Sequence, residues 1–512
     1  MNKQLEAHNY YRSETKVFKA FIQCPMTITR KFLQIGPRKL QVCGRLCIHT
    51  TSSVAQAPSP VKQQTSQQGI YVRATRAIPN VVLVDAVRTP FTVSNTHYKE
   101  LMAVDLQRHS LKALVDRTAI PFSDIGHIVC GCVIQECKTS NVAREAALTA
   151  GFPDSIPAHT VTLACISSSL SAHNIVNMIE TGYCNAGIAG GVELLSDVPI
   201  RYNRKARSAM LDLQKAKTFG KKWDYGTTIL SNLLKPELPA VAEFVSGETM
   251  GHSGDRLAAA FGVSRKEQDE FAIRSHTLAD KAFKEGKLTD IMPVFVDKGK
   301  NKTTISKDTG VRISTMEQLT KLKPAFVKPH GTITAGNASY LTDGASAALI
   351  TSEQYAIEHG YKPKAYIRDT LFVAQDPKDQ LLLSPAYVIP KILAKNGLSL
   401  KDVDVFEIHE AFAGQVLANL NAMDSDWFCQ KYMKRPSKFG RVPLEKTNLW
   451  GGSLSLGHPF GATGVRLLAH AANRLIAEGG RYAVIAACAS GGHGVAQIFN
   501  SKIRVKDEQG VV

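Results

Sequence analysis

Short apolar runs alternate with amphipathic segments along most of the chain. Val81–Val84 is a continuous apolar run of strand length, and residues 127–134 form another. Up to about residue 200, segments with apolar residues at helical spacing separate such runs. Strands that are apolar on both faces are typical of a sheet covered by helices. The pattern therefore predicts an α/β fold that begins near residue 80.

The same order of helix end, turn and strand occurs twice. Residues 120–129 are matched by residues 398–407, with Asp124 and Asp402 in the two turns. A helix end that runs into a glycine-rich strand, residues 179–191, is likewise matched by residues 477–489. We interpret the matches as two copies of one α/β unit. Chance similarity between generic helix and strand segments is the alternative.

Residues from about 195 to 330 follow a different pattern. Ser264-Arg-Lys-Glu267 has the form of a capping box, and apolar residues follow it at helical spacing. We predict an inserted helical loop domain over residues 195–330. Residues 80–194 and 331–354 would then form an N-terminal half, and residues 355–512 a C-terminal half.

The composition is that of a globular protein, but the charge is unevenly placed. With 44% apolar and 21% charged residues, general disorder is excluded, and no run of apolar residues is long enough to span a membrane. Residues 1–84 hold 12 Lys and Arg against Glu6 and Glu14. This acid-poor segment predicts a mitochondrial transit peptide and linker over residues 1–79, starting at Met1 or Met26. A disordered basic tail is the alternative.

A second basic block lies inside the predicted insertion. Residues 201–222 hold eight Lys and Arg against Asp212 alone, and aromatic and leucine side chains follow from Trp223 to Leu234. Such a mixture predicts a hairpin near residues 201–240 that contacts an anionic membrane or a partner protein. A solvated hairpin and a site for CoA phosphates are the alternatives. Outside these two blocks the net charge is close to zero, so nothing indicates nucleic-acid binding.

The ten cysteines show no disulfide framework. Cys130, Cys132 and Cys137 could suggest a metal site. However, they lie in or beside an apolar run, and no Cys/His pair with ligand spacing accompanies them. We therefore expect these three cysteines to pack in the core, and we expect no metal.

Cys165 lies at a predicted junction between a strand and a helix. Residues 160–164 precede it, and an apolar stripe from Leu170 to Ile179 follows. A helix N-terminus favours a thiolate, so we expect a lowered pKa and a nucleophilic thiol. A small buried hydrophobic residue is the alternative reading.

Three further segments place His or Cys beside glycines at the ends of predicted strands. Gly457-His-Pro-Phe-Gly-Ala-Thr-Gly464 leads into a helix and holds His458 in a turn. Cys488 ends a buried strand and precedes Ser490-Gly-Gly, while His409 follows the strand-like residues 405–408. Four strand ends that present Cys or His are the arrangement expected of an acyl-transfer site in an α/β fold.

From about residue 80 to 500 the chain resembles the thiolase family. The resemblance rests on the following segments: Asp85-Ala-Val-Arg-Thr-Pro-Phe91, Cys165-Ile-Ser-Ser168, Gly336-Asn-Ala-Ser339 with Asp343-Gly-Ala345, His409-Glu-Ala-Phe412, and the His458 and Cys488 loops. It implies the thiolase fold, in which two similar βαβαβαββ halves form a five-layered αβαβα core with an inserted loop domain. It also implies a 3-ketoacyl-CoA thiolase of mitochondrial fatty acid β-oxidation, an acetyl-CoA C-acyltransferase with CoA as co-substrate and no permanently bound cofactor.

The resemblance also implies residue roles. Cys165 would be the nucleophile that attacks the 3-keto carbon and keeps the shortened acyl group as a thioester. His458 would take the Cys165 proton and then help to stabilise an oxyanion, and Cys488 would act as acid and base. Backbone N–H groups at Cys165 and Ser490 would form a second oxyanion hole. Ser339 would face the pantetheine arm of the substrate.

Two positions depart from the commonest thiolase pattern. His409 stands where many thiolases have Asn, which orients a water in the first oxyanion hole, and Ser490 stands where Gly is usual. A His at position 409 resembles the trifunctional branch of the family. That branch implies medium- or long-chain substrates and a thiolase homodimer. That branch also implies an α subunit with enoyl-CoA hydratase and 3-hydroxyacyl-CoA dehydrogenase activities in an α2β2-type complex. It further implies anionic lipid at the matrix face of the mitochondrial inner membrane.

Other functions remain open at this point. A biosynthetic-type acetoacetyl-CoA thiolase is the rival within the enzyme class, and His409 and the basic insertion argue against it. A peroxisomal thiolase suits the basic N-terminal segment less well than a mitochondrial one. A non-catalytic acyl-CoA-binding or RNA-binding protein with a thiolase fold is disfavoured because Cys165, His458 and Cys488 are all present.

Overall fold

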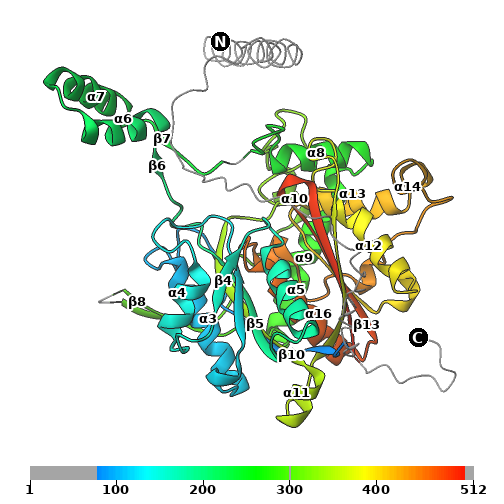
Figure 1. Cartoon of the computed structure of the whole chain (residues 1–512). Helices are drawn as coiled ribbons and strands as arrows, with labels where there is room; N and C mark the ends of the chain where they lie inside the picture. The colour runs from blue at the N-terminus through cyan, green and yellow to red at the C-terminus, as the bar shows by residue number, and fades with distance from the viewer. Residues whose placement is uncertain (1–77, 241, 299–300, 502–512) are drawn as a thin grey trace, which may run out of the picture. The chain divides into compact units, whose positions relative to one another are not determined.

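The computed structural model describes residues 78–240, 242–298 and 301–501. The predicted transit peptide therefore lies outside the described residues except for its last two positions, and so do both candidate start sites. Within these ranges no helix combines the length and the apolar character needed to cross a membrane. The expected α/β class is confirmed, since helices surround a mixed sheet (Figure 1).

The main sheet has ten strands. Nine form a continuous path in the order β12-β13-β14-β11-β1-β10-β5-β3-β4, and β2 pairs with β10. The pairs β12–β13, β3–β4 and β3–β5 are parallel, and the other pairs are antiparallel. The two halves of the path join where β1 pairs with β11. The strands are β1 (Val81–Arg88), β2 (Thr92–Val93), β3 (His127–Gly131), β4 (Ala158–Val161), β5 (Ala186–Glu193), β10 (Thr342–Ser352), β11 (Ala365–Ala374), β12 (Val405–Ile408), β13 (Tyr482–Ala489) and β14 (His493–Asn500).

Both pairs of matched sequence segments fold alike. A 3₁₀ turn, η1 (Phe122–Asp124), leads into β3, and η2 (Leu400–Asp402) leads into β12 in the same way. The helix α5 (Ser167–Glu180) runs into β5, and α16 (Thr463–Glu478) runs into β13. The duplicated unit inferred from the sequence is therefore present, and each copy ends in an antiparallel pair, β5–β10 and β13–β14.

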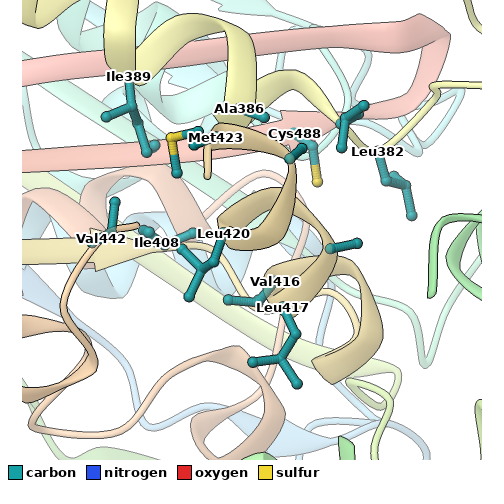
Figure 2. Packing of buried hydrophobic residues seen from close by; sticks show 14 of the residues in the cluster. Leu382, Ala386, Ile389, Ile408, Val416, Leu417, Leu420, Met423, Val442 and Cys488 are labelled. Atoms are coloured by element: carbon teal, nitrogen blue, oxygen red, sulfur yellow. The ribbon is translucent and has the colours of Figure 1, made fainter. Parts of the chain in front are cut away.

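Helices form three layers, and the two halves of the sheet lie between them. The helices α5 and α16 lie side by side and contact strands of both halves (Figure 1), and a central apolar cluster fills the space around them. A second cluster covers the N-terminal half beneath α3 (Ala103–Thr118) and α4 (Val142–Ala150). A third lies between the C-terminal half, α12 (Ser384–Lys395) and α13 (Ala413–Met423), as Figure 2 shows. Helix and sheet layers thus alternate as the thiolase resemblance implied.

The predicted insertion is mainly helical, but it also contains strands. Two short antiparallel pairs, β6–β7 and β8–β9, accompany its helices. Ser264 caps α9 with the predicted box, since its side chain accepts the Glu267 N–H and Glu267 bonds back. The helices α8 and α9 contact α13, so this part packs on the C-terminal half. The elements are β6 (Arg201–Tyr202), α6 (Arg204–Lys215), α7 (Phe219–Asn232), β7 (Pro236–Glu237), α8 (Met250–Ala260), α9 (Arg265–Lys284), β8 (Val294–Lys298), β9 (Asn301–Ile305) and α10 (Met316–Thr320).

Three short α-helices remain to be named: α11 (Glu353–Glu358), α14 (Asp426–Met433) and α15 (Ser453–Leu456).

A buried arginine ties the insertion to the first strand. The Arg88 Nε donates to Asp290 at 2.6 Å, and its two terminal nitrogens donate to Asp308 at 2.6 and 2.8 Å. Removing one member would leave a buried charge without its partner, which costs several kcal/mol.

Candidate active site

Cys165 lies in the turn between β4 and α5. The preceding residue, Ala164, has φ of 45°, a left-handed conformation that an alanine rarely adopts. Ser167 fixes this turn, because its hydroxyl accepts the Leu163 N–H at 2.8 Å and donates to the Ala164 carbonyl at 2.7 Å. The turn therefore presents the Cys165 thiol just before the N-terminus of α5, as the sequence predicted.

His458 is buried in the glycine-rich loop that precedes α16, although the sequence suggested a turn away from the core. Gly457 has φ of 106°, and the His458 N–H donates to the Thr342 hydroxyl at 3.0 Å. A Cβ at Gly461 would overlap the carbonyl oxygens of Val192 and Gly131. The glycines thus allow a loop of the C-terminal half to lie directly on strands of the N-terminal half.

The hydrogen bonds of His458 determine which ring nitrogen carries its proton. Thr463 Oγ1 donates to the Pro459 carbonyl at 2.9 Å, so at 2.7 Å from His458 Nδ1 it must accept. This network assigns the proton to Nδ1. The Nε2 atom then keeps a lone pair, and it has no hydrogen-bond partner among the described residues. A buried, unpartnered lone pair is what a general base needs.

His409 follows β12 and takes the opposite tautomer. Arg466 Nη2 donates to the Ser453 hydroxyl at 2.7 Å, and that hydroxyl lies 2.9 Å from His409 Nδ1. Ser453 thereby accepts from Arg466 and can donate its own proton to Nδ1. This assignment places a hydrogen on Nε2 of His409, which has no described partner. His409 therefore offers a donor where His458 offers an acceptor.

Three side chains that are far apart in the sequence meet at this point. The Sγ of Cys165 and ring nitrogens of His409 and His458 all lie within 4.8 Å of one another, and the ring centroids of the two histidines are 4.1 Å apart. A thiol and two imidazoles are also the donor types that zinc prefers. The two tautomers instead fit proton transfer, with a base and a hydrogen-bond donor beside one thiol.

Burial keeps this group uncharged at neutral pH. It raises the pKa of the Cys165 thiol to about 12, although the backbone N–H groups of Cys165 and Ser490 favour the thiolate. Burial, with the nearby Arg466, lowers the pKa of His458 to about 3 and that of His409 well below its usual value. The expectation that the helix N-terminus lowers the thiol pKa is therefore wrong, because desolvation of the thiolate outweighs the helix terminus.

Cys488 is the penultimate residue of β13 and is 1% exposed. It lies among the apolar side chains around α12 and α13 (Figure 2), so burial raises the pKa of its thiol, and the neighbouring Cys165 raises it further. The Ser490 N–H acts on the Cys165 sulfur, which places the loop after Cys488 beside the nucleophile. Ser339 is half-buried, and its N–H bonds to the Ala411 carbonyl at 2.9 Å, which joins its segment to the His409 loop.

The cysteines outside this site follow the sequence expectation only in part. Cys130 and Cys132 are buried in apolar clusters, as predicted. Cys137 is exposed and lies 3.7 Å from Arg201, so its predicted place in the core is wrong. Among the described residues these cysteines belong to no grouping with metal-ligand geometry.

Several residues that hold the site in place were not found from the sequence. Glu193, at the end of β5, accepts the N–H groups of Ile134 at 2.8 Å and Gly461 at 3.0 Å, and burial raises its pKa to about 7. A lone acid at the end of a buried glycine-rich strand was the available signal. Thr463 and Ser453 gave no such signal, because short hydroxyl residues near a histidine are common.

Family models and known proteins match most of the chain. Residues 81–354 match the family model described as thiolase, N-terminal domain, and residues 361–501 match thiolase, C-terminal domain. The chain is 71% identical over 428 residues to a probable 3-ketoacyl-CoA thiolase of Caenorhabditis elegans, covering 84% of this chain and 95% of that protein. It is 60% identical over 424 residues to the human mitochondrial trifunctional enzyme subunit beta, covering 83% of this chain and 89% of that protein.

A solved structure shows the same fold. The crystal structure of human mitochondrial 3-ketoacyl-CoA thiolase aligns with a TM-score of 0.70 at 30% identity, covering 84% of this chain and 100% of that chain.

Proposed function

Because the chain belongs to the thiolase family, we propose that it is a 3-ketoacyl-CoA thiolase of mitochondrial fatty acid β-oxidation. It would cleave medium- and long-chain 3-ketoacyl-CoA with CoA, giving acetyl-CoA and an acyl-CoA two carbons shorter. The observation that carries this proposal is the convergence of the Cys165 thiol with the unpartnered Nε2 atoms of His409 and His458. CoA is a co-substrate, and no permanently bound cofactor takes part.

The first half reaction forms an acyl-enzyme. Nε2 of His458 takes the Cys165 proton as the sulfur attacks the C3 carbonyl, and the negative charge moves to the carbonyl oxygen. Backbone N–H groups of Cys165 and Ser490 stabilise this oxyanion, and the protonated His458 and a water oriented by His409 stabilise the enolate oxygen that forms in the next step. When the carbonyl re-forms, the C2–C3 bond breaks and its electron pair leaves as the enolate of acetyl-CoA. Cys488 protonates the enolate carbon, which releases acetyl-CoA and leaves a thioester on Cys165.

The second half reaction transfers the acyl group to CoA. The Cys488 thiolate takes the proton of the CoA thiol, and the CoA sulfur attacks the thioester carbon. Backbone N–H groups of Cys165 and Ser490 stabilise the charge that develops on the acyl oxygen. The Cys165 thiolate then leaves and recovers its proton from His458, so both cysteines return to their starting state.

Incubation with 3-ketohexadecanoyl-CoA in the absence of CoA tests this chemistry. We expect a tetradecanoyl thioester on Cys165, detected by intact mass and peptide mapping, together with one acetyl-CoA per site. Addition of CoA should discharge the adduct as tetradecanoyl-CoA. A kcat/KM series from C4 to C16 distinguishes the readings, since a maximum at C4 would favour an acetoacetyl-CoA thiolase. Failure to form a thioester with any chain length would refute the enzymatic proposal.

The relatives also bear on partners and location. Those named as trifunctional enzyme subunit beta are mitochondrial, so we place this chain in the mitochondrion with an α subunit as its partner. The α2β2-type complex, a thiolase homodimer and the matrix face of the inner membrane are finer parts of the proposal. Support for a homodimer comes from β4, a half-buried strand at the edge of the main sheet, whose free edge can pair with another chain.

The hairpin formed by α6 and α7 supports contact with anionic lipid. Most of α7 and half of α6 are exposed, and Phe219, Trp223 and Leu230 are 81%, 65% and 73% exposed. Basic residues flank these apolar side chains, and Figure 1 shows the two helices side by side. Apolar side chains that enter an interface beside cations attracted to phosphates are typical of peripheral membrane contact.

Charge reversal tests the lipid contact. Changing Lys215, Lys217, Lys221 and Lys222 to Glu should weaken binding to cardiolipin-containing vesicles at least about tenfold, because each cation near an anionic surface contributes to attraction. The matched control reverses four exposed lysines outside the hairpin, Lys362, Lys378, Lys391 and Lys401, which changes the net charge equally. Unchanged vesicle binding by the hairpin variant, or equal loss by the control, would contradict a specific contact.

A further inference from the structure

A carboxylate of the insertion reaches the loop that follows Cys488. Glu243 Oε1 accepts the Ser490 hydroxyl in a short hydrogen bond, and it accepts the Gly491 N–H at 3.1 Å. Glu243 and Ser490 are both half-buried. Ser490 is one of the two positions at which the sequence departs from the commonest thiolase pattern. The hydroxyl that distinguishes Ser490 from glycine thus bonds to Glu243, a residue of the insertion.

The loop that Glu243 holds contains flexible backbone. Gly491 and Gly492 have φ of 82° and 72°, and glycine restricts the backbone less than any other residue. The far side of the loop is fixed separately, because Gly492 accepts the Gln375 N–H at 3.0 Å and the His493 carbonyl accepts the Ser384 hydroxyl at 2.6 Å. Glu243 thus fixes the near side, where the Ser490 N–H lies close enough to the Cys165 sulfur to lower the pKa of its thiol.

Glu243 is itself held by a tight turn. Its N–H donates to the Glu248 carbonyl at 2.8 Å, and its carbonyl accepts the Gly247 N–H at 2.8 Å. The Glu248 carboxylate accepts Arg256 Nη2 at 3.0 Å, which joins the turn to α8. These bonds fix the backbone of Glu243. Its carboxylate can therefore hold Ser490 in one position.

We propose that Glu243 is a positioning residue for acyl transfer, which holds the Ser490 N–H in the oxyanion hole and so makes the active site depend on the insertion. The role rests on the proposed thiolase function. The Glu243 side chain touches no reacting atom, and it acts through the Ser490–Gly491 backbone. Because an oxyanion hole works only when its donors are already in place, loss of this support lowers the rate of acylation more than the binding of substrate.

Two substitutions separate hydrogen bonding from charge. In Glu243→Gln the amide oxygen can still accept from Ser490 and Gly491, whereas Glu243→Ala removes the acceptor. We expect Glu243→Ala to lower kcat about tenfold with KM changed less than twofold, a loss typical of weakened oxyanion stabilisation. Glu243→Gln should retain most of the wild-type kcat. Glu237→Ala, which removes a carboxylate of the insertion that pairs with Arg207, is the matched control.

Alkylation of Cys165 by iodoacetamide reports the effect of the Glu243 charge, provided that an unchanged thermal midpoint in both variants excludes unfolding as the reason for faster reaction. The Glu243 charge raises the pKa of the Cys165 thiol, so both Glu243 variants should be alkylated faster than the wild type at pH 8. Acylation by 3-ketohexadecanoyl-CoA should fall only in Glu243→Ala. Equal acylation of Glu243→Ala and wild type, or an equal loss in Glu243→Gln, would overturn the positioning role. Absence of acylation in the wild type would instead refute the thiolase function itself.

Discussion

Replacing Cys165 with Ser is expected to lower kcat/KM for thiolysis by roughly 10⁴-fold or more, the scale of loss seen when a covalent nucleophile is removed. A hydroxyl is a much weaker acid than a thiol, and the neutral His458 beside it is a weak base, since burial lowers its pKa to about 3. The variant should therefore bind 3-ketohexadecanoyl-CoA without releasing acetyl-CoA. Stopped-flow detection of acetyl-CoA measures its release, intact mass detects any acyl adduct, and isothermal titration calorimetry measures binding of the substrate.

Cys137→Ser is the matched control for the first prediction, because Cys137 is an exposed free cysteine outside the site. It should retain full activity. A Cys165→Ser protein that still forms an acyl adduct would contradict the assignment, and peptide mapping would then identify the true nucleophile. An unchanged thermal midpoint in Cys165→Ser excludes unfolding as the reason for the loss.

The positions of three chemical groups could be predicted because each lies at or just beyond the end of a strand. Cys165 follows the half-buried β4, His409 follows the buried β12, and Cys488 lies near the end of the buried β13. Functional groups of an α/β fold are expected where its strands end. His458 was found from its glycines, which bring backbones of the two halves into contact. The fold class followed from the same alternation of strands and helices.

The protonation of the site could not be predicted in the same way. A helix N-terminus favours a thiolate, but desolvation of the half-buried Cys165 thiol raises its pKa instead. The tautomers depend on Thr463 and on the pair Ser453 and Arg466, which come from loops and helices whose contacts no local pattern reveals. Desolvation is a property of the packed molecule, so the sign of a pKa shift follows from packing more than from sequence.

The insertion shows a similar limit. Its helices were visible from the capping box at Ser264 and from apolar spacing, and its basic hairpin was visible from charge. The short pairs β6–β7 and β8–β9 were missed because two to five residues carry too little periodicity to identify a strand. The contact of Glu243 with Ser490 spans 247 residues, and such a pairing exists only once the chain has folded.

Replacing His458 with Ala is expected to lower the rate of Cys165 acylation roughly 10³-fold, within the range for loss of a general base. In the wild type, Nε2 stays unprotonated at all pH values well above the pKa of about 3, so acylation should be nearly independent of pH from 6 to 9. In the variant the thiol must ionise without help. Because its pKa is raised to about 12, the thiolate fraction and the residual rate should rise about tenfold per pH unit over the same range.

The pH dependence distinguishes a base from a residue that only shapes the pocket. A variant that merely distorts the site would lose rate equally at every pH, and its profile would stay flat. Thr463→Val gives the intermediate case, because it removes the acceptor for Nδ1–H but leaves the imidazole in place. Its acylation rate should fall about tenfold, and the pH profile should stay flat. A neutral imidazole remains available, but its tautomer is no longer fixed. A flat profile in His458→Ala would contradict proton transfer to His458, and attention would then move to Nε2 of His409, the other unpartnered nitrogen beside the thiol.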